Sequence, residues 1–288
     1  MPAARVPLFA DVALAARIEA AERDYVASCA RASSGAAIVT PLAGGVALWA
    51  GDDSPLNKVA GLGFAGPFDE IAEAALAEHE RRLDERGAAV QVELAALAAP
   101  SLAPLLSRRG YALVGFENVL GRRLDALDDA AQTRADDPAI DLCAAPADDA
   151  AWLEAAVAGF TAPDVDGLPA HEAFDAASLR AVFRDMSSAD GSRRYLARRG
   201  DVVVGSAAAR FAADARLAQL CGASTLPAHR RRGVQTALLR ARLRDAAAAG
   251  CELAVVTTLP GSRSQLNVQR QGFELLYTRA LLVRPPPA

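Results

Sequence analysis

The sequence predicts an α/β (α+β) protein with two tandem copies of one fold. Three observations support this prediction. The chain has 288 residues, enough for two domains of ordinary size. Helical and strand-like segments alternate along it. The segments also recur: Gly87 and Gly250 end equivalent helices at an offset of 163 (250 − 87), and Gly110 and Gly272 precede equivalent strands at an offset of 162 (272 − 110).

The composition excludes several classes of protein. Apolar residues make up 52% of the chain, but much of this is alanine, and no uninterrupted apolar run reaches the roughly 18 residues of a membrane-spanning helix. Asp11, Glu19 and Glu22 stand where a signal peptide would be apolar. The net charge is −4 and no basic stripe alternates with aromatic residues. We therefore expect a cytoplasmic protein that binds neither membrane nor nucleic acid.

The cysteines point to neither zinc nor disulfides. Cys29, Cys143, Cys221 and Cys251 are scattered, form no C-x-x-C pair, and have only three histidines to join them. We interpret them as small, mostly buried residues and expect no bound metal.

The first half (residues 1–124) predicts a complete set of elements. Glycine pairs and turn residues separate the apolar stretches. Gly87 ends a helical pattern at 68–85, whose apolar positions include Ile71 and Leu83. The predicted elements are a helix at 11–32, strands at 36–51 and 57–66, a helix at 68–85, a strand at 89–97, a helix at 101–109 and a strand at 111–124.

An acidic, alanine-rich segment at 125–138 ends at Pro138 and is typical of a linker. The second half (residues 139–288) repeats the order. It predicts a strand at 139–146, a helix at 147–160, a loop and helix over 161–188, a hairpin over 193–213 that turns at Gly200, a strand at 217–226, a helix at 236–249 and a strand at 252–258.

The turn between residues 226 and 236 carries the strongest functional signal. Arg230, Arg231, Arg232 and Gly233 stand where a strand ends and a long helix begins. The first N–H groups of a helix have no helical partner and the helix dipole is positive there, so this end suits an anion. Guanidinium groups bind phosphate oxygens in a fork. We predict a pyrophosphate site, the alternative being a solvated basic turn.

This turn resembles the pyrophosphate loop of the GNAT superfamily of acyl-CoA-dependent N-acyltransferases, which reads Arg/Gln-x-x-Gly-x-Gly/Ala. Residues 230–234 fit, and Gln235 replaces the last small residue. A second match follows at SRSQLNVQRQGF (262–273). The resemblance implies that each domain is a mixed, mostly antiparallel sheet flanked by helices. It also implies direct transfer of an acetyl group from acetyl-CoA to a primary amine of a small molecule or protein terminus.

The resemblance further implies which residues contact the cofactor and which do the chemistry. The family often has a tyrosine acid where this chain has Val268, so Tyr277 is the candidate acid. The base is unknown; Glu172 and Asp175 could take a proton or simply form a polar helix face. The expected cofactor-binding residues are Ser224, Thr225 and Leu226 on the strand, Arg231, Arg232, Gly233, Val234, Gln235 and Thr236 at the turn, and Ser264 and Asn267 on the next helix.

The first half lacks this chemistry. At the offset of 163, Pro67, Phe68, Asp69 and Glu70 occupy the positions of residues 230–233. Two carboxylates at a helix start repel a pyrophosphate, so we predict that this copy does not bind the cofactor and is structural or forms a wall of the substrate site. A non-enzymatic CoA-sensing or protein-interaction module is the alternative function. We expect a monomer or a homodimer.

Overall fold

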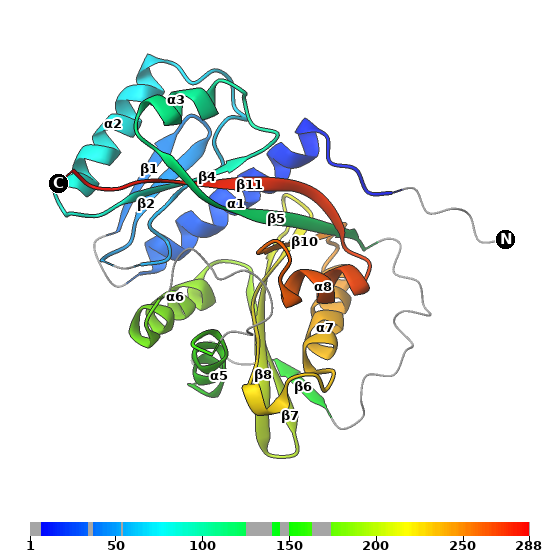
Figure 1. Cartoon of the computed structure of the whole chain (residues 1–288). Helices are drawn as coiled ribbons and strands as arrows, with labels where there is room; N and C mark the ends of the chain where they lie inside the picture. Colours follow the sequence, from blue (N-terminus) through cyan, green and yellow to red (C-terminus); the bar gives the residue numbers. More distant parts are fainter. Residues whose placement is uncertain are drawn as a thin grey trace.

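The computed structural model of the chain describes residues 7–33, 37–52, 54–124, 140–144, 150–162 and 174–287. In these residues, 11 strands form one continuous sheet in the order β1-β2-β3-β4-β11-β5-β10-β9-β8-β7-β6 (Figure 1). Neighbouring strands are antiparallel except β3 with β4 and β9 with β10. The sheet is therefore mixed and mostly antiparallel, and helices flank it, as the sequence predicts.

The elements follow the predicted order in both halves. The first half contains α1 (Val12–Ala32), β1 (Ile38–Leu42), β2 (Gly45–Trp49), β3 (Val59–Ala60), α2 (Glu70–Asp84), β4 (Val90–Ala95), α3 (Leu102–Arg108) and β5 (Ala112–Arg123). The second half contains β6 (Asp141–Ala144), α5 (Ala150–Phe160), α6 (Ala176–Ser188), β7 (Ser192–Arg199), β8 (Val202–Ala212), β9 (Leu217–Thr225), α7 (Val234–Ala248), β10 (Leu253–Thr258), α8 (Arg263–Arg270) and β11 (Glu274–Arg284). The predicted linker at 125–138 lies outside the described residues, so the domain boundaries stay predictions.

The strand order confirms the repeat and adds an exchange of strands. Apart from β6, the order reads the same from both edges when β1 to β5 are matched with β7 to β11. Each half gives its last strand to the other: β4 pairs with β11, and β10 pairs with β5. Val92 pairs with Leu282 and Val255 with Gly121, at offsets of 163 (255 − 92) and 161 (282 − 121). The two halves thus share a single sheet.

A pseudo-two-fold axis passes between β5 and β11. Glu117 pairs with Arg279, and these two residues are themselves equivalent at the offset of 162 (279 − 117). Each strand also carries one extra residue in a bulge, Val114 in β5 and Leu276 in β11, again 162 apart (276 − 114). Equivalent positions of the two copies therefore face each other across this axis.

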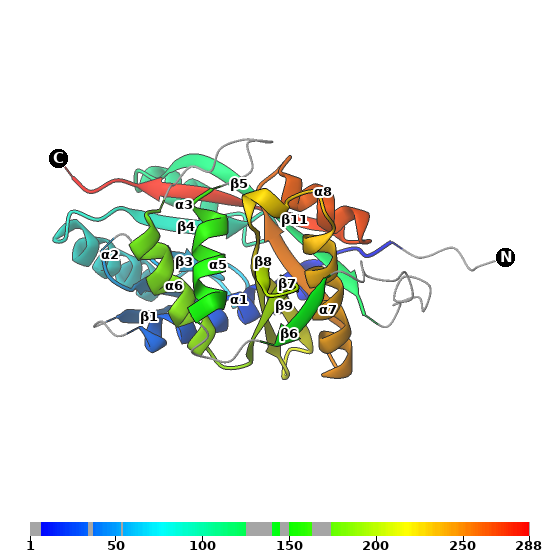
Figure 2. The same cartoon turned by 90° about the horizontal axis from the view of Figure 1, so that it is seen from below.

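The helix α1 connects the two halves on one face of the sheet. Asp11 caps it by accepting a hydrogen bond from the N–H of Leu14 at 2.8 Å. Ile18 packs in one cluster with residues of β9, β10 and β11, and Val26 packs in another with β2 and β3. α5 and α6 lie side by side (Figure 2) and cover β7 and β8 on this same face. The clusters of α2, α3 and α7 lie on the opposite face.

Two local expectations for the first half are wrong. The strand expected at 57–66 is only Val59–Ala60, because Gly61, Gly63 and Gly66 all have positive φ, which ends a regular strand. Ile71 is 80% exposed, because α2 begins at Glu70 and turns its first-turn side chain to solvent. The hairpin of β7 and β8 is confirmed, with its turn at Gly200.

The cysteines are free thiols, and Cys29 and Cys251 are buried as expected. Cys143 is exposed, because it lies in the edge strand β6, which has a neighbour on one side only. Among the helices described, none combines the length and the apolar character that crossing a bilayer demands.

Candidate functional site

The turn before α7 presents the start of a helix to solvent. A short 3-10 turn at Pro227–His229 leads from β9 to Gly233, the N-cap, whose φ is +79° and which places no side chain over the helix end. Glycine adopts this φ without steric cost. The N–H groups of Val234, Gln235 and Thr236 lie in the first turn, where no intrahelical acceptor exists. Together with the helix dipole, they make this end suitable for an anion.

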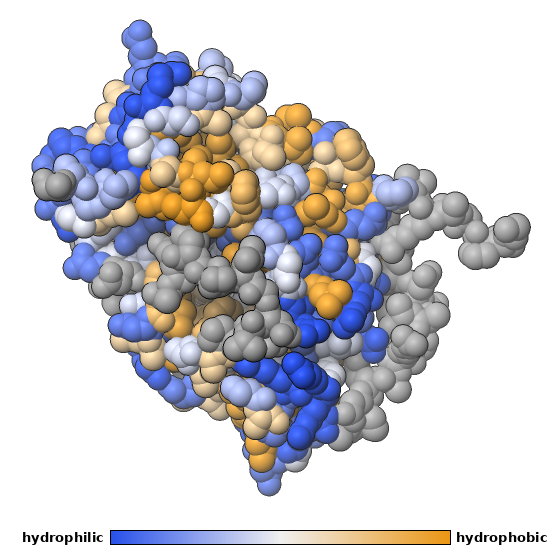
Figure 3. All heavy atoms as spheres, viewed as in Figure 1, coloured by the Kyte–Doolittle hydropathy of each residue, from blue (hydrophilic) through white to orange (hydrophobic). Residues whose placement is uncertain are grey.

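Arginines surround this helix start. Arg231 and Arg232 are exposed, and the surface over this turn is hydrophilic (Figure 3). Arg199 of β7 donates from Nη2 to the carbonyl of Arg232 at 3.1 Å and so holds the turn. Arg230 turns inward, where its Nε donates to the carbonyl of Thr225 at 3.3 Å. Arg199 and Arg230 thus bind backbone carbonyls at the turn, whereas Arg231 and Arg232 are exposed.

The helix α8 meets the same end of α7. The Nδ2 of Asn267 donates to the Oε1 of Gln235, so two residues that the sequence predicts at the cofactor touch each other. The long side chain of Gln235 is thereby directed toward α8 and away from the helix axis. Ser264 is exposed in the first turn of α8, and Ser262 is the residue that caps this helix.

β9 and β10 separate at the end nearest this turn. Their parallel pairing stops at Leu220 and Val256, although β9 continues to Thr225 and β10 to Thr258. A bulge lies at this point, where Gly222 and the residue after it stand opposite a single residue of β8. The backbone edge of β9 beyond the bulge therefore has no β10 partner in the described part of the chain.

The residues expected to line this gap are partly engaged elsewhere. The hydroxyl of Ser224 donates to the carbonyl of Ala155 in α5 at 3.0 Å and lies 3.0 Å from the hydroxyl of Ser206. The N–H of Leu226 donates to the carbonyl of Val204 at 3.0 Å. Neither group can bind a thioester without first breaking these bonds, so backbone groups nearer the bulge fit that role better.

Tyr277, the candidate acid, is buried on β11 and its hydroxyl donates to Oε1 of Glu19 at 2.7 Å. Burial and the neighbouring Glu19 carboxylate raise the pKa of Tyr277 above its ordinary value. β5 also lies between β11 and β10. This geometry favours a structural role for Tyr277.

Cys221 directly precedes the bulge and carries a thiol. Its Sγ lies 3.3 Å from the hydroxyl of Tyr25 in α1. Burial raises the pKa of Cys221 to about 11. Because the thiolate is the reactive form, Cys221 is a poor nucleophile at neutral pH.

Two carboxylates near the gap come from the first half, where sequence reasoning did not look for them. Glu22 of α1 accepts a hydrogen bond from Nε2 of Gln219 in β9 at 3.0 Å. Glu117 lies on β5, the strand next to β10. Residues 22 and 219 are 197 positions apart, and no sequence pattern joins them.

The two carboxylates named from the sequence do not lie in a defined site. Glu172 is outside the described residues. Asp175 is the N-cap of α6 and accepts a hydrogen bond from the N–H of Ser178 at 2.7 Å, which lowers the pKa of Asp175. The position of Asp175 is thus explained by helix capping.

Residues 161–273 match the family model described as the Acetyltransferase (GNAT) family. This span contains the turn at Gly233, the separation of β9 from β10, and α8. The second half therefore contains a segment that matches the GNAT family model, and we refer to this half as the GNAT domain.

Solved structures resemble the whole chain in fold. The GCN5-related N-acetyltransferase from Kribbella flavida is 23% identical, covers 96% of each chain and has a TM-score of 0.65. The tandem GNAT protein from the clavulanic acid biosynthesis pathway is 16% identical, covers 98% of each chain and has a TM-score of 0.62. A GCN5-related N-acetyltransferase from Sphaerobacter thermophilus is 15% identical, covers 88% of this chain and 76% of its own, and has a TM-score of 0.59. No curated protein sequence matches the chain.

The first half differs from the GNAT domain at the two matching places. Asp69 caps α2 by accepting from the N–H of Ala72 at 2.9 Å, so a carboxylate lies where Gly233 leaves α7 open. Beyond β3, the carbonyl of Gly63 accepts the N–H of Ala99 at 3.0 Å, and a Cβ at Gly63 would lie 2.6 Å from Leu102. In the first half, the chain before α3 therefore fills the space that corresponds to the open gap between β9 and β10.

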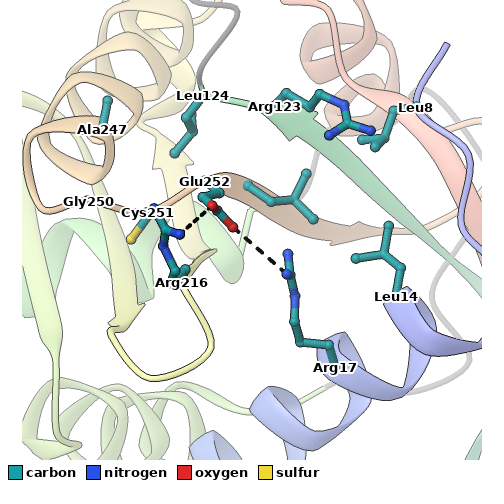
Figure 4. Close-up of a pocket in the computed structure, with 11 residues that line it drawn as sticks. Leu8, Leu14, Arg17, Arg123, Leu124, Arg216, Ala247, Gly250, Cys251 and Glu252 are labelled. Carbon is teal, nitrogen blue, oxygen red and sulfur yellow. Dashed lines mark ion pairs between the residues drawn. The ribbon is translucent and has the colours of Figure 1, made fainter. Parts of the chain in front are cut away.

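Figure 4 shows a pocket of about 500 Å³ at the far end of the GNAT domain. It lies where α7 ends and β10 begins, opposite the turn at Gly233. Glu252 forms ion pairs there with Arg216 at 2.5 Å and Arg17 at 4.0 Å. This pocket is separate from the candidate site.

Proposed function

We propose that the GNAT domain transfers an acetyl group from acetyl-CoA to a primary amine of a small molecule or a protein terminus. The observation that carries this proposal is the open start of α7, with Gly233 as its cap and the exposed Arg231 and Arg232 beside it. A diphosphate suits this combination of free N–H groups, helix dipole and guanidinium groups. The adjacent gap between β9 and β10 suits an extended thioester arm.

The chain's own residues would hold acetyl-CoA along this path. The first-turn N–H groups of α7 and the two exposed arginines would bind the pyrophosphate. Asn267 and Ser264 would approach the arm from α8, on the other side of the gap. When bound, acetyl-CoA supplies an acyl carbon activated by its thioester. Donors on the unpaired edge of β9 near Gly222 would stabilise negative charge on the acyl oxygen.

Direct transfer to the amine fits the surroundings of Cys221. A covalent route would need its thiolate, which the raised pKa of about 11 disfavours at neutral pH. Direct transfer needs a neutral amine instead, and a lysine-like amine has a pKa of about 10.4. Holding both reactants in place contributes to the rate as much as acid or base help does.

The first half would support the site without binding acetyl-CoA. The Asp69 cap at α2 opposes a phosphate by like charge, and the contact of Gly63 with Ala99 closes the matching gap. α1 would instead form a wall of the acceptor side, because it brings Tyr25 and Glu22 against β9.

The alternative function is a CoA-sensing module, which is favoured by Val268 at the position where the family often has a tyrosine acid. Release of CoA thiol distinguishes acetyl transfer from this alternative. The full chain is mixed with acetyl-CoA and a panel of primary amines that includes small polyamines, amino sugars and peptides with free N-termini. We expect thiol release that requires both the chain and one class of amine. Binding of acetyl-CoA without amine-dependent thiol release across the panel would contradict the transfer reaction.

A further inference from the structure

Glu117 lies beside the end of β10, where β10 has already separated from β9. Thr257 of β10 pairs with Val119 of β5. Side chains alternate along a strand, so Glu117 and Val119 share one face with Thr257. This is the α1 face, because Val119 belongs to the cluster in which α1 packs. Cys221 faces the same side through its contact with Tyr25.

Solvent reaches Glu117, whereas its charged neighbours are enclosed. The Glu117 side chain is 25% exposed, compared with 4% for Glu93 and 2% for Arg279. Thr257 is exposed as well. Of these three charged groups, Glu117 is therefore the one that is open to a ligand from solvent.

Glu117 also lies farther from its nearest cation than Glu19 and Glu93 lie from theirs. Arg279 lies 2.8 Å from Glu19 through Nε, and Lys58 lies 2.9 Å from Glu93. The Oε2 of Glu117 is 3.9 Å from Nη1 of Arg279, beyond hydrogen-bond distance. The two cations are thus engaged with other carboxylates.

The surroundings of Glu117 raise its pKa to a value near neutral pH. Burial is the main cause, and the negative charge of Glu93 adds to it, so that the pKa of Glu117 is raised to about 7. A carboxyl group with such a pKa can take up and release a proton at physiological pH. The charged groups that face Glu117 are Glu93 from β4, Lys58 from the segment before β3, Arg279 from β11 and Glu22 from α1.

We propose that Glu117, which belongs to the first half, accepts the proton that the acceptor amine loses in the GNAT domain, directly or through one water. The inference rests on the proposed acetyl transfer. It gives the first half a catalytic role, because β5 is the strand that the first half contributes next to β10. It also implies an acceptor that arrives as an ammonium ion.

The step balances in atoms and charge. The ammonium group gives one proton to the Glu117 carboxylate. The neutral nitrogen then forms a C–N bond to the acyl carbon while the C–S bond breaks. A second proton of the amine goes to the departing thiolate, which leaves as CoA thiol, and one hydrogen stays on the amide. Glu117 returns its proton to solvent.

The pH profile of kcat/KM tests the inference, measured from pH 5.5 to 9 with the best amine of the panel. We expect the wild type to show a limb that rises with pH and levels near 7, far below the titration of the amine at about 10.4. Glu117→Gln should lose this limb and fall by roughly 10²-fold to 10³-fold in kcat/KM at pH 8. Glu117→Asp should keep the limb at a lower rate.

Glu93→Gln is the matched control, because it changes a buried carboxylate of the same cluster that solvent does not reach. We expect it to keep a pH limb that lies at lower pH, because the Glu93 charge that raises the pKa of Glu117 is removed. Acetyl-CoA binding, measured by calorimetry, should be unchanged in Glu117→Gln. A wild type that turns over while Glu117→Gln keeps both rate and limb would overturn the inference and leave acetyl transfer intact. A wild type that accepts no amine would overturn both.

Discussion

Arg279 holds together the charged cluster at the centre of the sheet. It is almost fully buried, donates to Glu19 at 2.8 Å, and lies 3.7 Å from Glu93. Lys58 balances Glu93 on its other side. Buried charges are tolerated only when they are paired and hydrogen-bonded, which these contacts achieve for all but Glu117.

At the residue scale, we predict that Glu117→Gln stabilises the protein above neutral pH. The pKa of Glu117 rises from 4.5 to about 7 on folding, so its ionisation opposes the folded state. The contribution of Glu117 to the free energy of unfolding is fully present below pH 4.5. It is lost as the pH rises through about 7, and the loss is no more than about 3 kcal/mol. Glutamine imitates the protonated form. Urea unfolding should show equal stability of both proteins at pH 4 and a more stable variant at pH 8.

A variant that is less stable than the wild type at pH 8 would contradict this interpretation. It would mean that the Glu117 carboxylate is well paired in the folded state and holds its proton weakly.

Cys221→Ala gives a second prediction at this scale. Because the Cys221 thiol stays protonated near Tyr25, we expect kcat within about threefold of the wild type. Steady-state thiol release with the accepted amine measures this. A loss of a hundredfold or more, together with an acyl-enzyme detected by mass spectrometry, would instead show a covalent route.

At the scale of single elements, the two equivalent helices begin in opposite ways. α2 starts with the Asp69 side chain on its N–H groups, and α7 starts with the bare Gly233. A side-chain cap stabilises a helix, whereas an uncapped start leaves donors for a ligand. The repeat thus has a capped helix start in one copy and an uncapped helix start in the other.

We predict that Asp69→Ala destabilises the protein by about 1 kcal/mol, because Asp69 caps the N–H of Ala72. Chemical denaturation at pH 7 measures the change. Asp69→Asn is the control, since asparagine caps equally well and should cost only a few tenths of a kcal/mol. Equal losses in both variants would show that the charge matters and the cap does not.

At the scale of the whole molecule, the tandem arrangement allows different residues to occupy equivalent positions at the pseudo-two-fold axis. In a symmetric dimer of single copies, a residue at the axis meets its own equivalent. Here Glu117 meets Arg279, two equivalent positions of opposite charge. Two copies of the second half would bring Arg279 against Arg279. The charges therefore favour pairing of one copy with the other in the same chain.

Sequence reasoning reached the repeat, the element order and the Gly233 turn, because these depend on local periodicity, glycine and charge. It did not reach the exchange of β5 and β11, since strand pairing depends on contacts between residues more than 150 positions apart, such as Glu117 and Arg279. It also missed Glu22 and Glu117 for this reason. The burial of Ile71 was predicted wrongly because α2 begins at Glu70, two residues later than predicted, and its first-turn side chain faces solvent.

We propose that one copy of the pair binds acetyl-CoA, through the open start of α7. Calorimetric titration of acetyl-CoA into the wild type and into an Arg232→Asp, Gly233→Glu double variant tests it most directly, because the variant gives α7 the acidic start of α2. We expect one equivalent bound by the wild type and none by the variant. Two equivalents in the wild type, or undiminished binding by the variant, would contradict binding by this one helix start.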